Sequence, residues 1–131
     1  MIASGGILDE ALGAANDLSL QGIECRVLSM HTLRPFDASA VLKACRETGG
    51  IMTIEEHTLF GGLGSAVSEV CMDHGVYPRH FTRLGLHGEF SSVVGSQRYL
   101  REIYGLSRVQ ICNRVQTLLR NKERTAGTRE G

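Results

Sequence analysis

The sequence predicts an α/β fold with three layers (α/β/α), in which a mostly parallel sheet of about five strands lies between helices on both faces. Short apolar segments typical of strands alternate along the chain with segments whose apolar residues recur at helical spacing. Parallel strands need crossover helices that pack on the sheet. The length of 131 residues fits one domain and leaves little room for two.

The first half of the chain contains two strand segments and two helices. Residues 1–3 have the composition of the end of a strand, and apolar residues recur at helical spacing over 8–18. Gly22 follows where a helix end favours a left-handed residue. Residues 24–30 alternate in polarity as a strand does, and Asp37 can cap a second helix.

The second half continues the same alternation. Residues 51–55 form a mostly apolar strand segment, a third helix is predicted from about Gly62 to Asp73, and residues 81–86 supply a further strand. Ser96 can cap a short helix, and residues 107–110 form a capping box that begins the last helix. The predicted domain therefore covers residues 1–120, and residues 121–131 are predicted to be a polar, disordered tail.

Composition excludes several classes of protein. Fourteen Lys and Arg balance fourteen Asp and Glu, so there is no net charge to attract a polyanion or an anionic membrane. No apolar run approaches the roughly 20 residues that span a bilayer. We therefore expect a soluble protein with neither a nucleic acid nor a membrane as its partner.

The four cysteines are widely spaced, at Cys25, Cys45, Cys71 and Cys112, and form no metal-ligand motif. We interpret them as buried free thiols in a reducing compartment. The amino-terminal residues lack the charged and apolar regions of a secretory signal. These features predict a cytoplasmic protein.

The segment from Glu55 to Ala66 carries most of the functional information. It follows a strand and enters a helix, which is where open α/β sheets place ligands. Amide groups at such a helix terminus can hold a small anion. The interpretation favoured from the residues is structural: Gly61 and Gly62 permit a sharp turn, and Gly64 lets the helix lie close to the sheet or to another chain. The spacing does not match a nucleotide-binding motif.

Glu55, Glu56 and His57 are consecutive titratable residues at the same strand end. They could form an acid/base set, and an autonomous hydrolase is one hypothesis for the chain. No nucleophile or second acidic group accompanies them, so catalysis by these three residues is the weaker interpretation. A hydrogen bond of His57 at an interface is the favoured one.

Residues 54–70 closely resemble the third, C-terminal domain of the transketolase and deoxyxylulose-phosphate synthase family of thiamine-diphosphate enzymes. Further segments are similar to that domain, in the family's order, and together they extend the resemblance over roughly residues 1–120. They are residues 26–30, 33–37 (with the R-P-x-D loop), 83–86, 88–90 and 104–107.

The resemblance implies a supporting role. In this family two other domains hold thiamine diphosphate and a divalent metal, and the G-D-G motif that anchors the diphosphate is absent from this sequence. The resemblance therefore implies no catalytic, cofactor-binding or metal-binding residue in this chain. It implies subunit packing and homodimer contacts, with interface roles for Glu55, His57 and the turn from Gly61 to Ser65.

Two main functional hypotheses follow. The first is a C-terminal domain, or a separately encoded subunit, of a transketolase-like enzyme for ketol or acyl transfer, inactive without its thiamine-diphosphate-binding partner. The alternative is a stand-alone interaction or small-anion-binding module that uses the turn from Gly61 to Ser65. Both place the candidate interface or anion site at Glu55, His57, Gly61, Gly62, Gly64 and Ser65.

Overall fold

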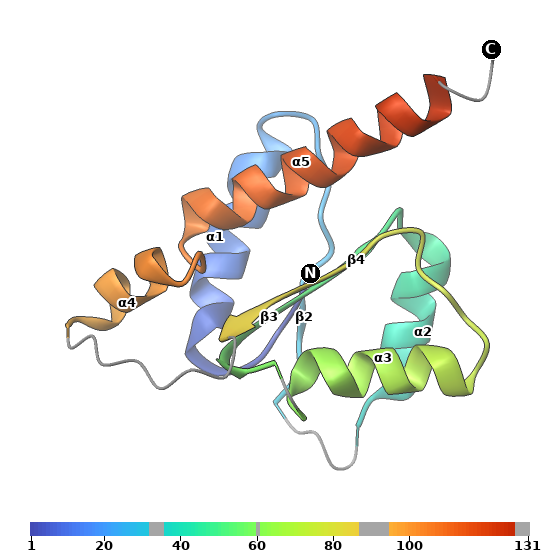
Figure 1. Cartoon of the computed structure of the whole chain (residues 1–131), viewed down its shortest axis with the longest axis horizontal. Helices are drawn as coiled ribbons and strands as arrows, with labels where there is room; N and C mark the ends of the chain where they lie inside the picture. The colour runs from blue at the N-terminus through green and yellow to red at the C-terminus, as the bar shows by residue number, and fades with distance from the viewer. Residues whose placement is uncertain (32–35, 60, 87–94, 128–131) are drawn as a thin grey trace.

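A computed structural model shows a parallel sheet of four strands between two layers of helices (Figure 1). It describes residues 1–31, 36–59, 61–86 and 95–127, except for the side chains of 57, 58 and 122–127. The strands are β1 (Ile2–Ala3), β2 (Leu28–Ser29), β3 (Ile51–Thr58) and β4 (Phe81–Leu86). The helices are α1 (Leu8–Ser19), α2 (Ala38–Glu47), α3 (Leu63–Asp73), α4 (Gln97–Ile103) and α5 (Arg108–Gly127), with a short 3-10 helix, η1 (Gly5–Ile7).

The strand order is β2-β1-β3-β4, and each neighbouring pair is parallel. The predicted α/β class and parallel sheet are confirmed. The described residues form four strands rather than about five, because the described chain after β4 is helical. Segments 33–35 and 88–90 of the family resemblance lie outside the described residues.

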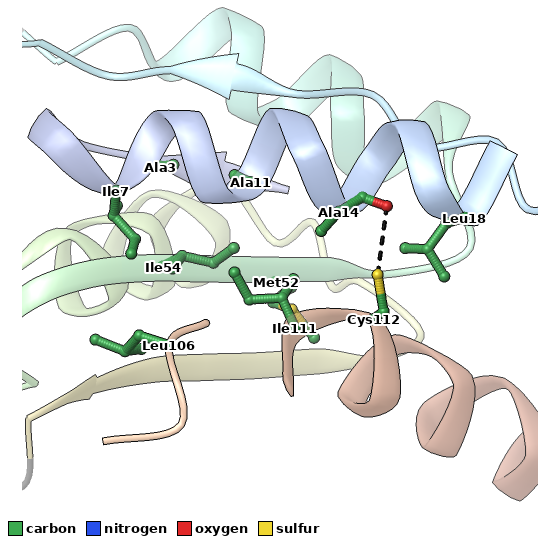
Figure 2. Close-up of a cluster of buried hydrophobic side chains, with 10 residues drawn as sticks. All are labelled: Ala3, Ile7, Ala11, Ala14, Leu18, Met52, Ile54, Leu106, Ile111 and Cys112. Carbon is green, nitrogen blue, oxygen red and sulfur yellow. Dashed lines mark hydrogen bonds between the residues drawn. The ribbon is translucent and has the colours of Figure 1, made fainter. Parts of the chain in front are cut away.

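Successive side chains of β3 point to opposite faces of the sheet, and each face has its own core. Met52 and Ile54 pack toward α1 and α5, whereas Ile51 packs toward α2 and α3. Both faces are covered by helices, which explains why the strand is apolar at successive positions. The first core, shown in Figure 2, consists of Ala3, Ile7, Ala11, Ala14, Leu18, Met52, Ile54, Leu106, Ile111 and Cys112.

The predicted helix caps are present. Oδ1 of Asp37 accepts a hydrogen bond from the Ala40 amide at 3.1 Å, and Oγ of Ser96 accepts one from the Tyr99 amide at 3.3 Å. The Ser107 amide donates to Oε1 of Gln110 at 3.2 Å, and the Gln110 amide donates back to Oγ of Ser107 at 3.4 Å. Each of these caps satisfies amides that the helix itself leaves unpaired.

Three boundaries differ from the sequence-based expectations. Strand β2 covers only residues 28–29 of the predicted 24–30, because β1 beside it contributes only Ile2 and Ala3 to the ladder. Strand β3 continues to Thr58. Helix α5 continues to Gly127, so residues 121–127 of the predicted tail are helical; they contain Lys, Glu, Arg and Ala, which favour helix.

Among the described helices, none combines the length and the apolar composition that a membrane span requires.

Candidate functional site

The turn between β3 and α3 is organised by the carboxylate of Glu55. This side chain is 1% exposed and points toward the amino end of α3. Its Oε1 accepts from the Leu63 amide at 3.0 Å, and its Oε2 accepts from the Gly64 amide at 2.8 Å. Two amides that α3 cannot pair internally are thus satisfied, and the negative carboxylate lies at the positive end of the helix dipole.

Anion binding is the alternative that the sequence predicts for this turn. The carboxylate of Glu55 occupies the position at which such an anion would bind. The two amides that it bonds are the ones that a bound phosphate or carboxylate would use. An external anion would have to displace a buried side chain of the same protein. The geometry here serves to hold the turn in place.

The glycines of the turn have separate roles. Gly61 has φ +68, a left-handed conformation that allows the chain to reverse between strand and helix. Gly62 is the residue before α3 and has an extended backbone. At Gly64 an added Cβ would lie 2.6 Å from Cδ of Arg83 and 2.9 Å from Oγ1 of Thr53, so glycine permits the close packing of α3 on the sheet.

Two further groups complete the packing of this turn. Oγ of Ser65 donates to the Leu59 carbonyl at 2.9 Å, which joins the first turn of α3 to the end of the preceding strand. Thr53 lies fully buried beneath Gly64, and among the described residues its Oγ1 has no hydrogen-bond partner. The contact between helix and sheet is therefore fixed by hydrogen bonds at the turn and by steric fit at Thr53.

Glu56 faces the opposite side of the sheet from Glu55. Its Oε1 pairs with Nε of Arg101 in α4, and its Oε2 accepts from Nε2 of Gln97 at 3.3 Å. Nη1 of Arg101 also lies 3.5 Å from Oε1 of Glu10 in α1. One guanidinium thus joins β3 and α1 to α4.

The hypothesis of an acid/base set at Glu55, Glu56 and His57 does not fit this arrangement. The two carboxylates diverge to opposite faces and are each bonded to other parts of the protein. The backbone of His57 belongs to β3, and its side chain lies outside the described side chains. Among the described residues, no group of three or more His, Cys, Asp or Glu side chains could hold a metal ion.

Sequence reasoning missed the partners of these acids. No sequence pattern links Arg101 to Glu56, which precedes it by 45 positions, and only the fold places them together. The sequence does indicate that the helix after Glu55 begins with unpaired amides, which need an acceptor. The residues alone favour a structural role for the glycines, with an external anion as the alternative, and they do not identify Glu55 as the acceptor of these amides.

Comparison with known proteins decides the family. The family model described as "Transketolase, C-terminal domain" matches residues 1–111. The chain belongs to the transketolase C-terminal domain family. The family prediction is therefore confirmed over nearly the whole of the predicted domain.

Two relatives of this transketolase C-terminal domain are named as subunits. It is 38% identical over 122 residues to the 6-deoxy-6-sulfo-D-fructose transketolase subunit SqwH of Clostridium sp. (strain MSTE9), covering 93% of this chain and 37% of the relative. It is 38% identical over 112 residues to a subunit of the apulose-4-phosphate transketolase of Phocaeicola vulgatus, covering 86% of this chain and 35% of that protein.

A solved structure has the same fold. It is described as a split gene transketolase, an inactive β4 tetramer, and matches with a TM-score of 0.78 and 36% identity. The match covers 88% of this chain and 37% of that chain. This transketolase C-terminal domain thus spans little more than a third of the length of its subunit relatives.

Proposed function

We propose that this chain acts as the C-terminal domain, or as a separately encoded subunit, of a transketolase-like, thiamine-diphosphate-dependent enzyme for ketol or acyl transfer. The observation that carries this proposal is the family match over residues 1–111 in a chain that spans 37% of a relative named as a transketolase subunit. The role assigned to the chain is packing against the rest of the enzyme.

The chemistry of the turn supports a packing role. Glu55 is bonded to the amides of α3 and Glu56 is paired with Arg101, so both acids position backbone and helices. The turn that Glu55 holds has Gly61 exposed. A fixed and exposed turn is suited to contact with a neighbouring domain, since little conformational entropy is lost when it binds.

The proposal places thiamine diphosphate and a divalent metal on the partner domains or partner subunit. Thiamine diphosphate, when bound there, stabilises the carbanion needed for transfer chemistry. Support comes from the sequence, which lacks the G-D-G motif that anchors the diphosphate in the family. This chain's own residues hold the turn between β3 and α3 in a defined orientation.

The test combines this chain with the thiamine-diphosphate-binding polypeptide from the same organism. With cofactor, Mg²⁺, a ketose phosphate and an aldose phosphate, we expect no turnover by this chain alone. We expect ketol transfer, and co-elution of the two chains in size-exclusion chromatography, when both are present. Turnover by this chain alone, or full activity of the partner without it, would contradict the proposal.

We further propose that copies of this chain contact one another in the assembled enzyme, in the cytoplasm. The solved relative is described as a β4 tetramer, which supports association between copies. Sedimentation of the reconstituted enzyme should give a mass that corresponds to two or more copies of each chain. A mass that corresponds to a single copy of this chain would contradict this part of the proposal.

A further inference from the structure

Two cysteines far apart in the sequence meet between α2 and α3. These helices lie side by side on one face of the sheet (Figure 1). Sγ of Cys45 in α2 and Sγ of Cys71 in α3 are 3.5 Å apart, with 8% and 4% of the two residues exposed. Among the described residues, the only hydrogen bond of either side chain is the one between these sulfurs.

The other two cysteines lie on the opposite face of the sheet. Cys112 is part of the core beneath α1 and α5, and its sulfur donates to the Ala14 carbonyl at 3.5 Å (Figure 2). Cys25 packs at the edge of the same core. The sheet therefore separates these two thiols from the pair formed by Cys45 and Cys71.

The surroundings of the pair favour a disulfide over other oxidised forms. A disulfide bond is about 2.0 Å long, so the sulfurs must approach by roughly 1.5 Å to form one. The nearby side chains are apolar, including Val41, Leu63 and Val67. A sulfenic acid would leave a polar hydroxyl in this core, whereas a disulfide introduces no new polar group and breaks no other hydrogen bond.

We propose that Cys45 and Cys71 form a site of oxidative modification, at which a peroxide converts the two thiols into a disulfide that links α2 to α3. In the first step one sulfur attacks the peroxide, the O–O bond breaks, and a sulfenic acid and water form when hydrogen peroxide is the oxidant. In the second step the other sulfur attacks the sulfenic sulfur and releases a second water. The peroxide gains two electrons, and the two thiols together lose two electrons and two protons.

The rate of this reaction is limited by burial. Burial, followed by the hydrogen bond with Cys71, raises the pKa of Cys45 to about 12. Thiolates are the reactive species, so the pair should be oxidised more slowly than an exposed thiol. Formation of the disulfide therefore requires prolonged exposure to peroxide.

The disulfide would constrain the candidate interface. The enclosed segment runs from Cys45 to Cys71 and contains β3, Glu55 and the glycine turn. Closing this segment restricts the unfolded chain and ties α3 to α2. We therefore expect oxidised protein to melt at a higher temperature, and reduction by dithiothreitol to reverse the change.

The experiment uses the folded wild-type chain. Hydrogen peroxide is added in native buffer, free thiols are alkylated in denaturant, and a non-reducing tryptic digest is analysed by mass spectrometry. Each cysteine falls on a different tryptic peptide. We expect a cross-linked pair of the Cys45 and Cys71 peptides, lighter by two hydrogen atoms than their sum, with Cys25 and Cys112 alkylated.

Two variants provide the comparison. Cys71→Ser should lose both the cross-link and the rise in melting temperature, whereas Cys25→Ser should keep both. Alkylation of all four cysteines after peroxide, or a cross-link formed only in urea, would overturn the proposal. Sulfinic acids at Cys45 and Cys71 without a cross-link would also overturn it. The wild-type digest is decisive even if Cys71→Ser fails to fold.

Discussion

Glu55 acts as a helix cap supplied by a neighbouring strand. Ordinary caps come from the residue just before the helix, but here Gly62 holds that position and has no side chain to contribute. The carboxylate reaches α3 because β3 ends directly beneath its first turn. Glu55 is therefore buried because its carboxylate caps α3.

Replacing Glu55 tests this role. Glu55→Ala leaves two buried amides without an acceptor and is expected to lower the free energy of unfolding by about 2–4 kcal/mol. Glu55→Gln keeps one acceptor oxygen and should lose less. Urea denaturation measures both variants, with exposed Glu69→Ala on the same helix as the control. Equal stabilities of Glu55→Ala and Glu69→Ala would exclude the capping role.

Gly64 is the second residue on which the turn depends. Gly64→Ala would bring a methyl group against Thr53 and Arg83. Arg83 is exposed and can move aside, but buried Thr53 cannot. The expected loss in free energy of unfolding is about 1–3 kcal/mol, as in other overpacked cores. Thermal denaturation provides the measurement, and Gly49→Ala, whose added methyl meets nothing within 4 Å, should change stability little.

At the scale of elements, α4 depends on polar contacts. The helix has seven residues and none of them is buried. Its described links to the sheet and to α1 pass through Arg101, which contacts Glu56 and Glu10, and through Gln97. Such a helix contributes little apolar burial, so these contacts determine whether it stays docked.

Arg101→Ala should therefore release α4 selectively. Amide hydrogen exchange over residues 97–103 is expected to accelerate roughly tenfold, since about 1.4 kcal/mol of local stability corresponds to one decade. Protection of α1 and β3 should stay near the wild-type level. Arg98→Ala, an exposed arginine on the same helix, is the matched control, and equal exchange in the two variants would contradict the assignment.

The contact between α1 and α5 depends on Arg108. Its Nε donates to Oδ2 of Asp17 at 2.5 Å, and its Nη2 pairs with Oδ1. Gly13 makes room for this side chain, because a Cβ there would lie 2.9 Å from Cδ of Arg108. The hydrogen bonds from Arg108 hold the pKa of Asp17 below its ordinary value.

This shift predicts a pH dependence. A carboxyl group whose pKa is lower in the folded state stabilises that state at pH values above the unfolded pKa of about 3.9. This stabilisation is lost as the pH falls through the lower pKa of the folded state. Asp17→Asn should therefore be less stable than wild type at neutral pH, and the difference should shrink in acid. Urea denaturation between neutral and acidic pH tests this, with exposed Asp73→Asn as the control. A difference that stays constant with pH would contradict it.

At the scale of the whole molecule, the amino ends of the strands border a pocket. An apolar cavity lies in line with β1, with residues 23–26 on one side and 49–52 on the other. Helix α2 lines it through Ala44 and its capping residue Thr48, and α5 through Val115, Leu118 and Leu119. The amino group of Met1 donates to the Arg26 carbonyl, and burial lowers the pKa of this amino group.

Filling the cavity should stabilise the domain. Val-Ile-Val placed before Met1 would continue β1 between the two flanking segments, and is expected to raise the free energy of unfolding by about 1–3 kcal/mol through apolar burial. Gly-Ser-Gly at the same place is the control, because it also converts the amino group of Met1 to an amide. Equal urea midpoints for the two extensions would show that the cavity does not accept a strand.

The α/β class and the order of elements follow from patterns along the sequence. The sequence also identified the caps at Asp37 and Ser96 and the box at 107–110. All of these depend on residues within a few positions of one another, so pattern and propensity suffice to find them. The family resemblance around residues 54–70 also depends only on the order of residues along the chain. The family comparison confirms this resemblance.

The roles of the polar and sulfur-containing residues become visible only in the packed fold. Glu55 and Glu56 are neighbours in sequence, yet they serve opposite faces of the sheet because strand side chains alternate. Cys45 meets Cys71, and Arg101 meets Glu56, only after helices pack on the sheet. Such contacts depend on the distances between packed elements, and these distances cannot be derived from a residue pattern along the chain.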